Sequence, residues 1–238
     1  MYGATAGTSD LRVRRFPARR TATSAVDAHG RPSDTGDWQG FRHLALALQR
    51  RAVAVDPLSA EGRFNLGLYL AAVDELDKAE AELRHARELS PMLPKIDFVL
   101  ARVLVKQRRF DEALAMIEQM PADPSREQAL ALALYGLGKV SAADAALARL
   151  AALAELQNAN RQLRILVAEV HAFRGNSDLA LDSIERALGP IATRPTTADI
   201  IFASQAVHRS PFFIPLREHA RWKALLPEQA SIGKVAAD

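Results

Sequence analysis

Residues 60–91, AEGRFNLGLYLAAVDELDKAEAELRHARELSP, decide the fold, because their pattern recurs along the chain at a fixed shift. Ala86 and Pro91 repeat Ala52 and Pro57, which lie 34 residues upstream (86 − 52 = 34; 91 − 57 = 34). A period of this length with helical patterning is typical of stacked helix–turn–helix units. One such hairpin cannot bury its apolar face alone, so we predict an all-α solenoid in which each hairpin covers the next.

Small residues mark the place where the two helices of one unit should cross. Gly67 and Ala79 are small enough for a close approach, and Leu83 would fill the space beside them. Pro91 should end the second helix, because proline cannot continue the helical hydrogen bonding. Three further hairpins are predicted, at about residues 94–123, 124–156 and 161–190.

One more helix is predicted upstream, at residues 38–55, as the second helix of a hairpin whose first helix is missing. Asp56-Pro57 should end it, because the residue before a proline is pushed out of helical geometry. The helical spacing predicts one apolar face made of Leu44, Ala45, Leu48, Ala52 and Val55. With this helix, the repeat region is predicted to span residues 38–190.

The repeat stops after residue 190, and residues 191–238 are predicted to form capping helices and a tail. A helix should run from about Thr197 to His208, since threonine can cap exposed amide groups at a helix start. The last hairpin of a solenoid needs a covered outer face. Three aromatic residues can supply that cover: Phe212, Phe213 and Trp222.

Residues 1–37 contain six arginines and four aspartates and show no helical or strand period. We expect a disordered basic segment here rather than a targeting signal, because no apolar run of signal-peptide length occurs. An alternative is that these arginines contact nucleic acid or an anionic membrane surface. The other 201 residues hold 25 basic and 24 acidic residues (31 − 6 = 25; 28 − 4 = 24). They form no basic stripe, so no nucleic-acid partner is expected there.

Composition excludes several kinds of site. The chain has no cysteine, which excludes disulfides and thiolate metal ligands. It has no run of 18 apolar residues, so no membrane span is predicted. With neither a span nor a secretory signal, we expect a cytoplasmic location. The six histidines are scattered, and neither a phosphate-binding loop nor a nucleophile elbow occurs. We therefore predict no catalytic residue, no cofactor and no metal.

The motif Leu66-Gly67, followed by Ala79, Leu83, Ala86 and Pro91, resembles the tetratricopeptide-repeat (TPR) family over roughly residues 41–190. The resemblance implies a TPR-type hairpin solenoid that acts as a non-catalytic scaffold for a protein or peptide partner. In that family the first helix of each hairpin lines a concave groove at recurring positions. Carried over, these positions predict a protein-binding groove lined by Phe64, Leu68, Phe98, Arg102, Leu132, Tyr135, Ile165 and Glu169.

Two interpretations of this groove stay open from the sequence. It could bind a partner helix or extended peptide, with aromatic anchors supplying most of the energy. Alternatively, the same side chains could form the core between hairpins or be covered by the tail of the chain. A clamp for a carboxyl-terminal peptide is not expected, because Val99 stands one repeat on from Asn65, where a second polar residue would be needed.

The tail has a narrower resemblance. Residues 215–217, PLR, and 221–226, RWKALL, resemble the ending of bacterial regulators in which TPRs follow a nucleotide-cyclase or winged-helix domain. The resemblance implies a regulatory or signalling setting. Residues 1–37 are too short and too irregular for either effector domain. One alternative function is therefore a regulatory remnant that is a stand-alone derivative, a shortened reading frame or a fragment.

Overall fold

A computed structural model of the chain describes residues 38–93, 95–156, 161–189 and 198–226. Within these ranges every regular element is a helix, which confirms the all-α prediction. The basic segment predicted at residues 1–37 lies outside them, as does Thr197. The elements are α1 (Trp38–Val55), α2 (Ala60–Ala72), α3 (Leu76–Leu89), α4 (Ile96–Lys106), α5 (Phe110–Glu118), α6 (Pro124–Gly136), α7 (Val140–Leu156), α8 (Arg161–Phe173), α9 (Ser177–Leu188), α10 (Ala198–Arg209), η2 (Pro211–Leu216, a 3-10 helix) and α11 (Ala220–Leu225).

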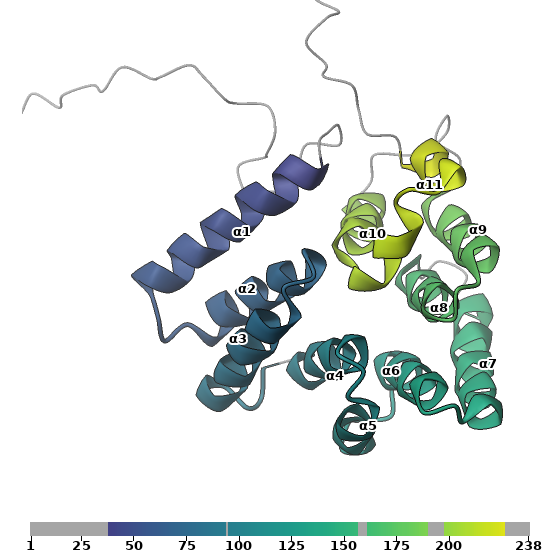
Figure 1. The fold of residues 1–238 in the computed structure, drawn as a ribbon, viewed down its shortest axis with the longest axis horizontal. Helices are drawn as coiled ribbons and strands as arrows, with labels where there is room; N and C mark the ends of the chain where they lie inside the picture. Colours follow the sequence, from purple (N-terminus) through teal and green to yellow (C-terminus); the bar gives the residue numbers. More distant parts are fainter. Residues whose placement is uncertain (1–37, 94, 157–160, 190–197, 227–238) are drawn as a thin grey trace, which may run out of the picture.

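The helices from α2 to α9 pair as four consecutive hairpins: α2 with α3, α4 with α5, α6 with α7, and α8 with α9. Figure 1 shows the hairpins following one another around an arc, with α10 and η2 on its inner side. The first helices of successive hairpins also contact one another, α4 with α6 and α6 with α8. The predicted fold, a solenoid of TPR-type hairpins with a C-terminal helical cap, is confirmed.

All four hairpins turn in the same way. At each joint one residue adopts the left-handed conformation: Asp74 (φ 65°), Arg108 (φ 63°), Gly138 (φ 71°) and Gly175 (φ 78°). The next N–H then donates to a carbonyl five residues earlier, as Glu75 does to Leu70 and Lys139 to Leu134, both at 2.9 Å. This Schellman arrangement satisfies carbonyls that the end of a helix leaves unpaired. Identical joints explain why the stack is regular although the repeat length varies.

The close crossing predicted inside the first hairpin is confirmed. A Cβ added to Gly67 would lie 2.7 Å from Cγ of Leu83 and 3.2 Å from the carbonyl oxygen of Ala79. No larger side chain fits there without moving the second helix. The four alanines that begin the second helices are all fully buried: Ala79, Ala113, Ala143 and Ala180.

The range predicted for α1 is confirmed, but the predicted apolar face is wrong except for Ala45. Ala45 and Leu46 are buried, and Val53 is partly buried against the core. Leu44 is 44% exposed, Leu48 47% and Val55 80%; Ala52 is exposed as well. The reason is that α1 packs on α2, while no described helix covers its other side. Within the described residues the stripe that faces away from α2 is therefore open, and the stripe facing α2 is the core.

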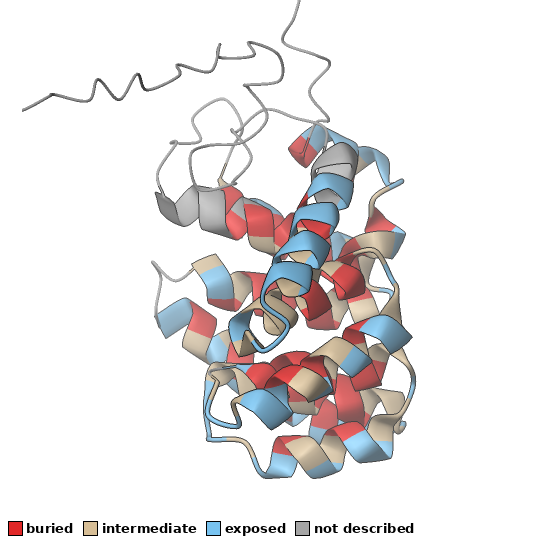
Figure 2. Ribbon diagram, turned by 90° about the vertical axis from the view of Figure 1, so that its left-hand side faces the viewer, coloured by how far each residue is buried: buried red, intermediate tan, exposed pale blue. Residues whose placement is uncertain are grey.

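The C-terminal elements pack mainly against the last hairpin, α8 and α9. Phe213 and Trp222 pack with α8 and α9, as predicted for the last hairpin. Phe212 does not join them, and that part of the prediction is wrong, because η2 turns its ring toward α4 and the main core instead. Figure 2 shows buried residues in red alternating with exposed residues along single helices, as expected of amphipathic helices whose inner faces are packed.

Candidate functional site

The eight residues predicted to line the groove come in pairs from the first helices of the four hairpins. The structure divides them into two groups. Those on α2 and α4 line a cavity, which Glu169 of α8 also borders, whereas Leu132 of α6 and Ile165 of α8 are buried. We call the first group the open half of the groove (Phe64, Leu68, Phe98 and Arg102) and the second the filled half (Leu132, Tyr135, Ile165 and Glu169).

The filled half is packed by the chain itself. Leu132 is fully buried in the main core, and Ile165 is 1% exposed in a cluster with Val207 of α10 and Phe213 of η2. Tyr135 differs, because it lies at the turn end of α6. Its hydroxyl hydrogen-bonds to Asp144, and burial together with that bond raises the pKa of Tyr135 to about 12. The sequence alternative in which these side chains are core between hairpins therefore describes Leu132, and the alternative in which the tail covers them describes Ile165.

A buried polar network fixes the tail to the groove. The carboxylate of Glu169 accepts hydrogen bonds from Arg102 and, at 2.8 Å, from Nε2 of Gln128. Ser210, at the start of η2, also hydrogen-bonds to it. Burial raises the pKa of Glu169, while Arg102 and Ser210 oppose that effect. The network joins α4, α6, α8 and the tail, so these four parts hold one another in place.

Aromatic and backbone contacts add to this attachment. The guanidinium carbon of Arg102 lies 5.1 Å from the ring centroid of Phe98 and also 5.1 Å from that of Phe212. The positive charge of the guanidinium is attracted electrostatically to both aromatic rings. Nζ of Lys106 donates to the carbonyl of Pro211 at 3.3 Å. Residues 210–212 are therefore held at several points along α4.

The open half borders a cavity of about 290 Å³. Phe64, Leu68 and Ala71 of α2 and Phe98 of α4 give its floor an apolar character. On the far side it is closed by α10 and η2, through Ala206 and Arg209 among others. A cavity of this size accepts one or two side chains of a bound segment rather than a whole helix.

Positive charge surrounds this cavity. Lys95, Arg102 and Arg209 line it, and its one carboxylate, Glu169, is engaged by Arg102. Lys95 is exposed, and no ion pair of its side chain is found within the described residues. The unbalanced charge favours an occupant with acidic groups beside an apolar side chain.

Sequence reasoning missed the part of the site that the tail supplies. Arg209, Ser210 and Pro211 form one wall, and Val99 and Val103 extend the floor along α4. The available signal was the aromatic run that follows Ser210-Pro211. It indicated a covering segment but not which surface it covers.

No known family model matches the chain, and no curated protein matches it. A solved structure described as YrrB, a TPR protein with an unusual peptide-binding site, resembles it at 19% sequence identity. The match covers 74% of this chain and 88% of that one, with a TM-score of 0.38. This degree of similarity assigns no function.

Among the described residues, no helix combines the length and apolar character needed to cross a membrane. Nor do three or more histidine and carboxylate side chains gather there as a group that could hold a metal ion.

Proposed function

We propose that this chain is a non-catalytic interaction scaffold that binds a peptide segment of a partner protein in the open half of its groove. The observation that carries the proposal is the 290 Å³ cavity between α2, α4 and the tail, with an apolar floor and a cationic rim. The bound segment would place an apolar side chain on Phe64 and Leu68 and acidic groups near Lys95 and Arg209.

The energy of such binding would come mainly from the apolar side chain. Burying one leucine- or phenylalanine-sized side chain contributes about 1.5–3 kcal/mol. The rim cations are exposed or partly exposed, so they would favour acidic partners and speed the encounter more than they would tighten the complex. We therefore expect weak affinity for a single short peptide and a marked dependence on salt.

The filled half supports this function from within the molecule. Where the filled half meets the open half, η2 packs on α8, Phe212 lies beside Arg102 of the open half, and Ser210 hydrogen-bonds to Glu169 of the filled half. The inner face of this stack thus accepts a segment that offers an aromatic anchor and a polar group. A partner segment in the open half would use the same kind of contact.

The test is selection from a random peptide library displayed against the full chain. We expect enriched peptides to combine a large apolar residue with acidic neighbours. Leu68→Glu should abolish capture of these peptides, because it puts a charge on the apolar floor. Leu179→Glu is the matched control, since Leu179 is 49% exposed on α9 and lies outside the cavity. Enrichment that both variants leave unchanged would refute the proposal.

We further propose that this scaffold acts in a regulatory or signalling setting. Its support is the resemblance of residues 215–217 and 221–226 to regulators that carry a cyclase or winged-helix domain. These residues also have a packing role, because Trp222 lies edge-on to His208 at 6.2 Å and Arg221 pairs with Asp182 and Glu185. Genomic sequence directly upstream tests this setting: a cyclase or winged-helix reading frame would favour a remnant, and its absence would count against one.

The alternative through the N-terminal arginines has its own test. If residues 1–37 bind nucleic acid or anionic lipid, deleting them should abolish that binding, and affinity before deletion should fall steeply with salt. The groove proposal predicts instead that peptide capture survives the deletion.

A further inference from the structure

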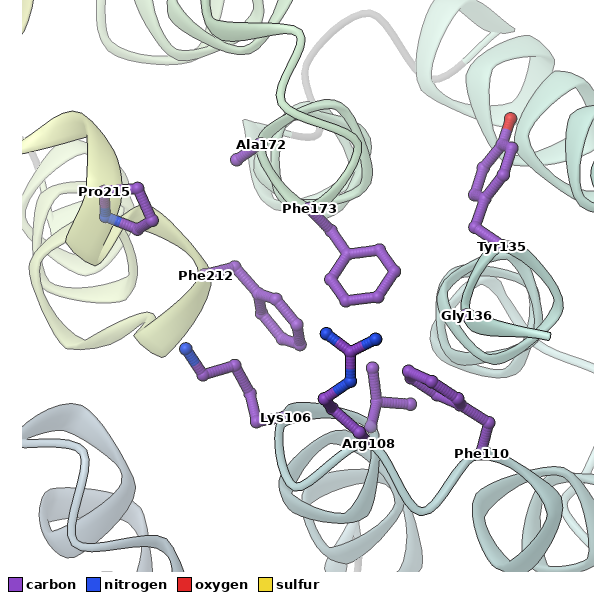
Figure 3. Close-up of a pocket in the computed structure, with 10 residues that line it drawn as sticks. Lys106, Arg108, Phe110, Tyr135, Gly136, Ala172, Phe173, Phe212 and Pro215 are labelled. Carbon is purple, nitrogen blue, oxygen red and sulfur yellow. The ribbon is translucent and has the colours of Figure 1, made fainter. Parts of the chain in front are cut away.

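A second cavity, of about 420 Å³, lies at the end of the groove where α4, α6 and α8 run into their hairpin turns. Figure 3 shows that the rings of Phe110, Phe173 and Phe212, from two hairpins and the tail, converge on it. Tyr135 also lines the cavity, but its ring points away from the other three. This aromatic cavity shares no lining residue with the cavity beside the open half, so the two could bind different ligands.

The rings are held in a fixed arrangement. Phe110 meets Phe173 edge-on at 6.4 Å between centroids, and Phe173 meets Phe212 in the same way at 6.1 Å. Gly136 makes room for Phe110, because an added Cβ would lie 2.3 Å from two of its ring carbons. Tyr135 turns its hydroxyl away, toward Asp144. The walls therefore present aromatic faces and edges without a structural rearrangement.

Two cations line the same cavity and no carboxylate does. Lys106 is partly engaged, with Nζ 3.3 Å from the carbonyl of Pro211 and 3.5 Å from Asp74. The guanidinium of Arg108 has no hydrogen bond or ion pair within the described residues. Figure 3 shows it lying among the rings of Phe110, Phe173 and Phe212. The charge complementary to this cavity is therefore negative.

The backbone conformation of Arg108 indicates that an arginine at this position does not serve the stability of the fold. It occupies the left-handed position of its joint, where the third and fourth hairpins have Gly138 and Gly175. A residue with a long side chain is disfavoured in this conformation, whereas glycine adopts it freely. Asp74 at the first joint is a residue type that tolerates it better. Strain of this kind at a side chain aimed into a cavity is typical of functional positions.

We propose that the aromatic cavity binds a small aromatic anion, a planar ring that bears a phosphate or carboxylate group. The ring packs against the sides of Phe110, Phe173 and Phe212 that face the cavity, in the offset or edge-on geometry that aromatic pairs prefer. The anionic group accepts hydrogen bonds from Arg108 and Lys106, the two donors that line the cavity. This binding is additional to the proposed peptide function and does not depend on it.

The test uses phenyl phosphate as the probe, with inorganic phosphate and phenol as its two halves. Titrations of the full chain are followed by NMR at the amides of the cavity. We expect saturable shifts with phenyl phosphate and at least tenfold weaker binding of each half alone. Arg108→Gly should weaken phenyl phosphate binding about tenfold or more, since a charge-assisted contact is lost. Equal binding of phosphate alone, or no saturable binding, would overturn the proposal.

Stability measurements separate this loss from unfolding. Because Arg108→Gly relieves the left-handed strain, its melting temperature should rise by about 2 °C. Asp74→Gly is the matched control: it makes the same backbone change at the first joint and leaves Arg108 and Lys106 in place. It should bind phenyl phosphate at least as tightly as the parent chain. A lower melting temperature for Arg108→Gly, or equal loss of binding in both variants, would contradict the inference.

Discussion

The two halves of the groove come from equivalent positions of the repeat, but their side chains are buried to different extents in the structure. Phe64 and Leu68 of the open half border a cavity, whereas Leu132 and Ile165 of the filled half are buried. All four lie on the inner sides of first helices. For Ile165 the difference is the tail, because α10 and η2 pack on α8, whereas Leu132 is buried in the core that the hairpins form with one another. A periodic pattern thus identifies an inner surface, but what covers it depends on segments outside the repeat.

Substitutions that detach the tail should lower the free energy of unfolding the most. Phe213 is fully buried and packs on Trp222 with ring centroids 5.8 Å apart. Phe213→Ala should lower the free energy of unfolding by about 3–5 kcal/mol, because a large side chain is lost from a closed core. Urea denaturation measures this. The exposed Leu179 gives the control, and Leu179→Ala should change it by less than about 0.5 kcal/mol.

A matched pair of substitutions tests the two halves against each other. Ile165→Ala should cost about 2–5 kcal/mol, as expected of a fully buried aliphatic side chain. Leu68→Ala should cost clearly less, since Leu68 is only partly buried beside the cavity. The same denaturation experiment compares them. Equal losses would mean that the two halves are packed alike, contrary to this description.

The pattern of residues was sufficient to predict the hairpins and insufficient to predict their surroundings. Gly67 and Leu83 predicted the helix crossing because the contact is local to one hairpin. The face of α1 was predicted wrongly because a helix rich in alanine, leucine and valine offers two apolar sides. Only the neighbouring helix decides which side is buried.

The same limit applies to the groove and to the turns. That Phe212 reaches Arg102 depends on how the tail folds back onto the stack of hairpins, which no local spacing encodes. The left-handed conformation at Arg108 could not be predicted from the sequence, because no glycine stands at that position. Both features nevertheless bear on the proposed sites.

A smaller effect should appear on acidification and should come from the C-terminal hairpin alone. Burial lowers the pKa of His171 on α8, and the guanidinium groups of Arg174 and Arg186 lower it further. The unfolded chain therefore takes up a proton at higher pH than the folded one does. This contribution to stability is present above the ordinary histidine pKa and is lost as pH falls through the lowered value.

The measurement is the difference in unfolding free energy between the parent chain and His171→Gln at several pH values. The unfolding free energy of the parent chain, relative to that of His171→Gln, should decrease as pH falls from 7.5 to about 5. Taking the difference removes the other five histidines from the comparison. A difference that does not vary with pH would show that His171 titrates normally.

The absence of cysteine from the chain permits the most direct test of the two halves. Leu68→Cys and Ile165→Cys each introduce a single thiol, whose reaction rate with a soluble maleimide is measured under native conditions. The structure predicts rapid labelling at position 68 and labelling at position 165 that is at least a hundredfold slower, limited by release of the tail. Labelling at similar rates would contradict a groove that is open at one end and filled by its own chain at the other.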